Sequence, residues 1–195
     1  SLRDAALRAL DSGEVKIVAL NATCNNNWTP VDWNVGPPRT VPMAFEVHCE
    51  LGDTIQGALE QVLIPGDVLL VSGTCNENVV ISGTVVGYSI GGITLDGQGS
   101  ATIHGPDTAK PTVDIIGHGT TIKGFTITGG RDGIMVERAR SATISGNTIT
   151  GTASQRDGIV VTTGGVATID GNTVQNWGRF GINLNQNGTG RIVNN

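Results

Sequence analysis

The sequence predicts an all-β solenoid in which short parallel strands stack coil upon coil, with three strands in each coil. The first reason is a repeat, because three short apolar motifs, the first of them Thr-apolar-x-Gly, occur in the same order four times between Gly92 and Asn195. The second reason is spacing, since successive copies start 27, 22 and 25 residues apart and Ile192 lies in a fifth that starts 23 residues later. The third is the apolar-polar alternation within each motif, which is typical of a strand with one buried face.

Each motif is expected to form one strand of a coil. The first motif reads Thr94-Leu-Asp-Gly97, Thr121-Ile-Lys-Gly124, Thr143-Ile-Ser-Gly146 and Thr168-Ile-Asp-Gly171, and the second reads Thr102-Ile-His-Gly105, Thr126-Ile-Thr-Gly129, Thr148-Ile-Thr-Gly151 and Thr173-Val-Gln-Asn176. The third is an apolar pair, Val113/Ile115, Ile134/Val136, Ile159/Val161 and Ile182/Leu184. Stacking then predicts buried columns such as Leu95-Ile122-Ile144-Ile169-Ile192 and Ile103-Ile127-Ile149-Val174.

Polar residues recur at fixed places as well. Asn147, Asn172 and Asn195 each follow the first motif directly, where earlier copies carry Phe125 and Gln98. Because an asparagine amide can bond the same group one coil away, these residues predict a structural ladder. The threonines that open the first and second motifs predict two exposed rows.

Residues 1–46 are expected to form an N-terminal extension. Within it, Leu2–Leu10 predicts a short helix that stops at Gly13, and Val15–Leu20 predicts a strand. Four prolines place the stretch 25–42, with Trp28 and Trp33, in a surface loop.

Residues 47–195 are expected to form the solenoid. A leading strand covers 47–49, and an amphipathic helix over 53–63 covers the open N-terminal end. Asp53 is the expected N-cap of this helix, with Gln56 three residues later, and Ile55, Ala58, Leu59 and Val62 form its apolar stripe.

Composition narrows the classes of function. The net charge is −5 and no basic cluster is present, which argues against nucleic acid as a partner. No apolar run approaches the roughly 18 residues that a transmembrane helix needs. The start, Ser1-Leu-Arg-Asp, lacks the layout of a signal peptide, so a secreted form would already have lost one.

From Val47 to Asn195 the chain resembles the bacterial right-handed parallel β-helix repeat proteins of the pectin-lyase-like superfamily. The block Gly52-Asp-Thr-Ile, Pro65-Gly-Asp, Val71-Ser-Gly-Thr-Cys-Asn-Glu-Asn78 and Val79-Val-Ile81 is similar to their N-terminal capping segment. The resemblance implies a right-handed, single-stranded parallel β-helix and a Cys49–Cys75 disulfide, and hence a secreted, cell-surface or periplasmic location. Cys24 is left over and is a candidate for a bond between subunits.

Enzymes of this superfamily place clustered acids on one sheet of the helix, and the resemblance implies the same location for an active site in this chain. Here no outward column carries two carboxylates on successive coils, and Asp96 with Lys123 predicts one surface ion pair. Asp132 and Asp157, beside Arg131 and Arg156, are the nearest candidates, but an Asp that bonds local backbone explains them too. His118 lies in a Gly-His-Gly turn like that of polygalacturonases, whose acidic motifs are absent.

The preferred hypothesis is therefore a non-catalytic secreted or cell-surface β-helix with a structural or binding role. Ile192 and Asn195, in a last coil without a capping helix, suggest end-to-end self-assembly. The alternative is a polysaccharide-active enzyme or a carbohydrate-binding module, in which Trp28, Trp33 and Trp177 stack on sugars; covering an apolar end is the other reading of these residues. Ice binding by Thr126-Ile-Thr128 and Thr148-Ile-Thr150 is a third reading. No cofactor or metal is expected, and glycosylation sequons occur at Asn21, Asn27 and Asn187.

Overall fold

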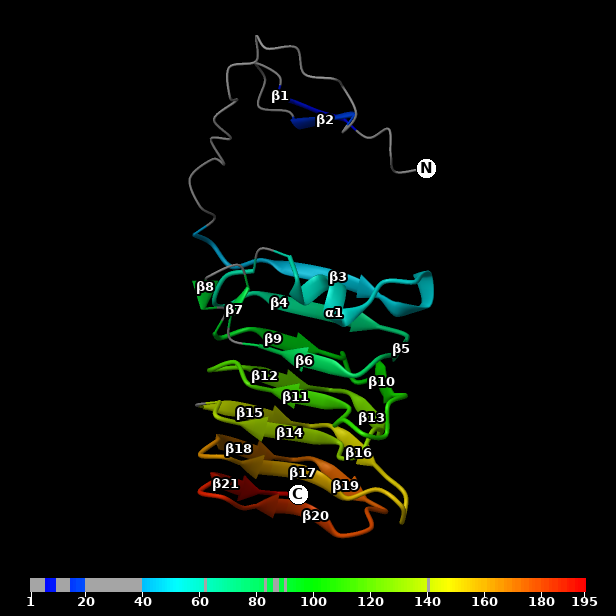
Figure 1. Ribbon diagram of the computed structural model, residues 1–195, viewed down its shortest axis with the longest axis vertical. Helices are drawn as coiled ribbons and strands as arrows, with labels where there is room; N and C mark the ends of the chain where they lie inside the picture. The colour runs from blue at the N-terminus through cyan, green and yellow to red at the C-terminus, as the bar shows by residue number, and fades with distance from the viewer. Residues whose placement is uncertain are drawn as a thin grey trace. The chain divides into compact units, whose positions relative to one another are not determined.

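The computed structural model describes residues 6–9, 15–19, 40–61, 63–82, 84–85, 88–89, 91–139 and 141–195. The chain divides into two compact units, 1–38 and 39–195 (Figure 1). In the first unit, β1 (Ala6–Ala9) pairs antiparallel with β2 (Val15–Ala19). The helix expected over Leu2–Leu10 is therefore wrong at 6–9, because pairing with the adjacent strand overrides the weak local preference for helix. The strand expected at Val15–Leu20 is confirmed over 15–19.

The second unit is a solenoid of three parallel sheets, here called sheets I, II and III (Figure 1). Sheet I contains β3 (Ala44–His48), β4 (Val68–Ser72), β9 (Thr94–Asp96), β12 (Thr121–Lys123), β15 (Ala142–Ser145), β18 (Val166–Asp170) and β21 (Thr189–Val193). Sheet II contains β5 (Thr74–Asn76), β10 (Thr102–Gly105), β13 (Thr126–Gly129), β16 (Thr148–Thr150) and β19 (Thr173–Gln175). Sheet III contains β6 (Val79–Ile81), β11 (Val113–Ile115), β14 (Ile134–Glu137), β17 (Asp157–Thr162) and β20 (Phe180–Leu184).

Three short elements complete the unit. A 3-10 helix, η2 (Cys49–Leu51), and the helix α1 (Ile55–Leu59) lie between β3 and β4. Strands β7 (Thr84–Val85) and β8 (Tyr88–Ser89) form a small antiparallel pair. No helix among the described residues has the length and apolar character needed to span a membrane.

The strand register confirms the predicted columns. In sheet I, Leu95 pairs with Ile122, Ile122 with Ile144, Ile144 with Ile169 and Ile169 with Ile192. In sheet II, Ile103 pairs with Ile127, Ile127 with Ile149 and Ile149 with Val174, and Cys75 extends this column. The isoleucines up to Ile169 are fully buried, and each such side chain contributes about 1.5–3 kcal/mol of transfer free energy.

The asparagine ladder is present on the turn between sheets I and II. The Oδ1 atom of Asn147 accepts the backbone N–H of Phe125, and its Nδ2 donates to the carbonyl of Ile122. Asn172 and Asn195 repeat this arrangement one and two coils further on. The ladder therefore satisfies backbone groups that the turn leaves without a partner in the sheets.

Candidate functional site

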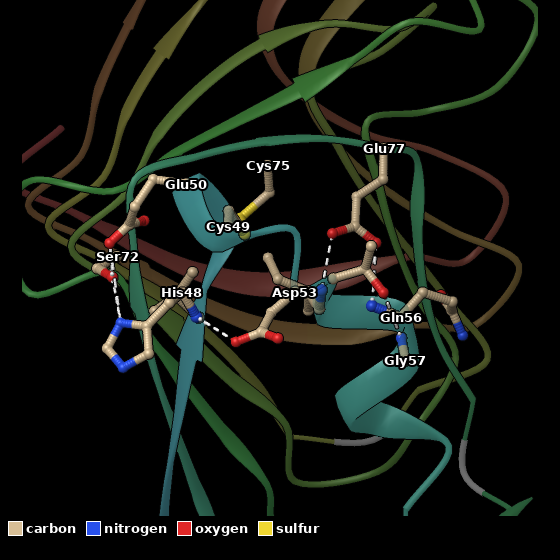
Figure 2. Close-up of a disulfide and its surroundings, with 12 residues drawn as sticks. His48, Cys49, Glu50, Asp53, Gln56, Gly57, Ser72, Cys75 and Glu77 are labelled. Atoms are coloured by element: carbon tan, nitrogen blue, oxygen red, sulfur yellow. Dashed lines mark hydrogen bonds and ion pairs between the residues drawn. A yellow bond between two sulfur atoms is a disulfide. The ribbon is translucent and has the colours of Figure 1, made fainter. Parts of the chain in front are cut away.

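The N-terminal end of the solenoid is closed by α1 and a disulfide (Figure 2). Cys49 in η2 is joined to Cys75 in β5, with Cα atoms 5.1 Å apart. This bond connects the cap to the first strand of sheet II, as the resemblance implied. Ile55 and Leu59 of α1 are buried in the core beneath it.

Two side chains position the N-terminus of α1, and neither is Asp53. Thr54 is the N-cap, and its Oγ1 accepts the N–H of Gly57. Both carboxylate oxygens of Glu77 accept backbone N–H groups, from Ile55 at 2.7 Å and from Gln56 at 3.0 Å (Figure 2). The expectation that Asp53 caps a helix over 53–63 is wrong, because Glu77 arrives from the turn after β5 and supplies the anion that a helix N-terminus favours.

Asp53 and Gln56 instead bond neighbouring strands. The carboxylate of Asp53 accepts the N–H of His48, and Oε1 of Gln56 accepts the N–H of Val80 at the start of sheet III. These bonds hold the capping segment on both flanking sheets.

A cluster of potential metal ligands lies at the same place but is already occupied by bonds within the protein. Cys49, Cys75 and Glu77 have ligand atoms within 4.8 Å of one another. The two sulfurs are joined, so neither is available as the thiolate that a metal requires. Because Glu77 also accepts two N–H groups, the cluster acts as a covalent and electrostatic anchor of α1.

A polar chain on the outer face of sheet I runs from Glu46 through His48 and Ser72 to Glu50. Nε2 of His48 lies 3.1 Å from Glu46, and its Nδ1 lies 3.0 Å from Oγ of Ser72 (Figure 2). The Ser72 hydroxyl donates to Glu50 at 3.0 Å. The Ser72 hydroxyl thus lies between Nδ1 of His48 and the Glu50 carboxylate. These polar side chains connect β3, β4 and η2.

Asp132 and Asp157, the nearest carboxylate candidates in the sequence, are both buried, Asp132 in the turn before β14 and Asp157 at the first residue of β17. Asp132 accepts Nε of Arg131 at 2.7 Å and the backbone N–H of Asp157 at 3.2 Å. The two acids are thus adjacent along the coil axis, and the first bonds the backbone of the second.

Asp157 repeats this arrangement with more partners. It accepts two hydrogen bonds from the guanidinium of Arg179, one from Nδ2 of Asn183 and one from the N–H of Phe180. Burial opposes ionisation of Asp157, but the bonds from Arg179 and Asn183 outweigh it and hold its pKa below the ordinary value. A carboxylate with these four bonds has little capacity left for a substrate.

The basic residues of these turns form a column. The N–H of Arg131 donates to the carbonyl of Lys110, that of Arg156 to Arg131 and that of Arg179 to Arg156. Their side chains differ, since Arg131 and Arg179 pair with buried aspartates while Arg156 is exposed and makes no side-chain bond within the described part of the chain.

Asp114 on the outer face of sheet III is the acidic residue whose position suits chemistry best. It lies between Val80 and Met135 in the sheet register, and its Oδ1 is buried without a hydrogen-bond partner. Burial and the nearby charge of Glu137 raise the pKa of Asp114 to about 6, although Arg138 and Arg131 act in the opposite direction. A carboxyl with this pKa exchanges a proton near neutral pH.

The proximity of Asp114 and Glu137 was not predicted from the sequence. The two acids lie on successive coils but in different outward columns, so that a comparison within one column did not bring them together. Glu137 itself accepts a bond from Arg138 at 2.6 Å. The signal was available in the sequence, because Glu137 is the next outward residue after Met135 in the same strand.

The remaining candidates occupy separate places. His118 is exposed in the turn between β11 and β12, and its carbonyl accepts the N–H of Gly92. Trp177 is half-buried, packs against the core and donates from Nε1 to the carbonyl of Ile149. Ile192 is 45% exposed in the last strand of sheet I. Cys24, Trp28 and Trp33 lie outside the described residues.

Residues 112–195 match the family model described as a right-handed β-helix region. Residues 39–195 thus form a parallel β-solenoid of three stacked sheets, and its part from 112 to 195 is similar to the right-handed β-helix family. A curated relative, a cell surface glycoprotein of Methanothermus fervidus, is 33% identical over 85 residues, which are 43% of this chain and 13% of the relative. The chain therefore spans a small part of the length of this relative. No solved structure matches the chain.

Proposed function

We propose that this chain is a non-catalytic β-helix module of a secreted or cell-surface protein, with a structural or binding role. The observation that carries the proposal is that the carboxylates of Asp132 and Asp157 are already occupied by hydrogen bonds to neighbouring residues of the solenoid. The disulfide supports an oxidising location, and the relative named as a cell surface glycoprotein supports a surface location.

Fractionation of the source cells tests the location. Antibody to residues 39–195 is expected to detect the protein in the medium or on intact cells, and brief protease treatment of intact cells is expected to remove it. Protein that is protected until the cells are lysed would contradict the proposal.

Self-association through the last coil is the binding role that we propose. Within residues 39–195, Val174, Ile182 and Ile192 line an open hollow of about 470 Å³, and β19, β20 and β21 are the outermost strands of their sheets. A second copy of the chain, stacked in the register that joins the other coils, covers this apolar surface and pairs these edges.

Light scattering after size exclusion tests this role. The wild-type chain is expected to form particles larger than one chain, and Ile192→Glu is expected to shift them to the mass of one chain. Thr152→Glu, at an exposed turn away from this end, is the matched control and leaves the particle mass unchanged. A wild-type chain that stays monomeric at high concentration contradicts self-association.

A second candidate function, action on a polysaccharide, is favoured by Asp114. Its raised pKa suits a general acid, and the neighbouring Glu137 supplies a second carboxylate on the same face. A screen of acidic and neutral polysaccharides for new reducing ends or unsaturated products, with and without calcium, tests it. Turnover that Asp114→Asn abolishes, and that Asp170→Asn on sheet I does not, would replace the non-catalytic proposal.

A further inference from the structure

The last turn of the solenoid carries a sequence for N-linked glycosylation, Asn187-Gly188-Thr189. It joins β20 to β21, and the other two such sequences, at Asn21 and Asn27, lie outside the described residues. Here the structure shows both the acceptor amide and the hydroxyl residue that the transferase must reach.

Asn187 is exposed at the tip of a tight turn. Its φ of 63° lies in the left-handed region, and the N–H of Gly188 donates back to the carbonyl of Asn185 at 2.7 Å. The carboxamide of Asn187 makes no hydrogen bond within the part of the chain that the structure describes. Its neighbour Asn185, in contrast, accepts the hydroxyl of Thr162.

Thr189 faces outward at the start of β21. Its backbone N–H donates to Gly165, which fixes the strand, and its register partner Val166 is 40% exposed. Gly190, the next residue, pairs with the buried Ala167, so the alternation of the strand directs the Thr189 side chain away from the core. The amide and the hydroxyl are therefore both accessible in the folded chain.

We infer that Asn187 is an N-glycosylation site; the inference rests on the proposed secreted or surface location. The donor is a glycan joined through its anomeric carbon to a phosphate leaving group. The Nδ2 atom of Asn187 forms a bond to that carbon, the carbon–oxygen bond to phosphate breaks, the phosphate leaves with the electron pair, and Nδ2 loses one proton to a base of the transferase.

A glycan at this position leaves the fold intact. Modification of Asn147 or Asn172 would break buried bonds of the ladder, whereas the Asn187 carboxamide makes no bond with the described residues. The turn also lies between sheets III and I, so a glycan here leaves the outer face of sheet II open.

Peptide mass spectrometry on the protein isolated from its source tests the inference. The peptide that contains Asn187 is expected to carry glycan in most molecules, and release by a glycosidase that converts Asn to Asp is expected to leave Asp at 187. An unmodified peptide overturns the inference, whatever the state of Asn21 and Asn27. Cell fractionation of the same sample reports on the location separately, so surface protein that is unmodified at Asn187 contradicts the inference alone.

Variants expressed in a host that glycosylates secreted proteins define the specificity. Asn187→Gln and Thr189→Ala are expected to lose the modification completely, while Thr189→Ser retains it because the hydroxyl remains. Asn176→Gln is the matched control, because Asn176 is exposed with a φ of 64° but has Gly178 two residues later. Glycan that persists at this turn in Thr189→Ala would also overturn the inference.

Discussion

Asn147 and Asn172 lie one coil apart, and Oδ1 of Asn172 accepts both the backbone N–H and the Nδ2 of Asn147, each at 3.0 Å. The single side-chain oxygen of Asn172 thus accepts hydrogen bonds from both the main chain and the side chain of Asn147 on the neighbouring coil. Both residues are almost fully buried, so water cannot reach their polar groups and these bonds satisfy them instead.

Asn147→Ala is expected to lower the free energy of unfolding by about 2–4 kcal/mol. The change leaves the N–H of Phe125 and the carbonyl of Ile122 buried without partners, and each such group costs about 1–3 kcal/mol. Urea unfolding followed by circular dichroism measures the effect. Asn76→Ala, at an exposed residue of β5 whose side chain makes no hydrogen bond within the described part of the chain, is the control and is expected to stay within about 0.5 kcal/mol of wild type.

Asp157→Ala is expected to destabilise the chain by about 1–3 kcal/mol, because it leaves the backbone N–H of Phe180 and the Nδ2 of Asn183 without their acceptor. Thermal unfolding compares it with Arg156→Ala, which removes an exposed side chain of the same column and is expected to have little effect. The contribution of Asp157 is present above its unfolded pKa and is lost as pH falls through its lowered folded pKa. Equal losses in the two variants would show that the Asp157 carboxylate does not hold the turn.

Asp114→Asn is expected to be more stable than wild type at pH 8, by about 1–2 kcal/mol after allowance for solvent screening of a half-buried group. The folded pKa of Asp114 is about 6, above its ordinary value of 3.8, so the folded state binds the proton more tightly. Wild-type stability therefore falls as pH rises from about 4 to 6, and this component is absent in Asp114→Asn. Urea midpoints across pH 4 to 8 measure it, and parallel curves for the two proteins would contradict the raised pKa.

Reduction of the Cys49–Cys75 disulfide is expected to lower stability by about 3 kcal/mol, since the bond closes a loop with a sequence separation of 26 residues. The measurement is the melting temperature with and without reductant in a Cys24→Ser background, which leaves these two cysteines alone. Cys49→Ser with Cys75→Ser in the same background is expected to reproduce the reduced value and to be insensitive to reductant. A melting temperature that reductant does not change in the parent would mean that the bond does not stabilise the cap.

The repeat in the sequence predicted the register of the core because each column is set by local alternation alone. Leu95, Ile122 and Ile144 could be aligned from their motifs, and the stacked strands place them as neighbours. The ladder was predictable for the same reason, since Asn147 and Asn172 hold the same place in successive copies. The Asp96–Lys123 ion pair followed from this alignment too, and its atoms lie 2.9 Å apart.

The capping segment was less predictable because its bonds join residues that are distant in sequence. Asp53 and Gln56 have the spacing of a local helix cap, but Glu77 reaches α1 from 22 residues beyond Ile55 and takes that role. The hydrogen bonds of the buried aspartates were predicted only in part from the sequence. A local backbone bond was expected of Asp132, whereas its acceptor oxygen bonds the N–H of Asp157 on the next coil.

The turns between sheets II and III differ in length from coil to coil while the strands on either side keep one register. Residues 106–112, 130–133, 151–156 and 176–179 make these connections, yet Ile103, Ile127, Ile149 and Val174 stay aligned. A foreign peptide inserted at 152–154, whose side chains are exposed, is thus expected to be carried on the side of the rod without disturbing the coils above and below. The architecture offers an evenly spaced scaffold on which epitopes or enzymes can be displayed at chosen heights.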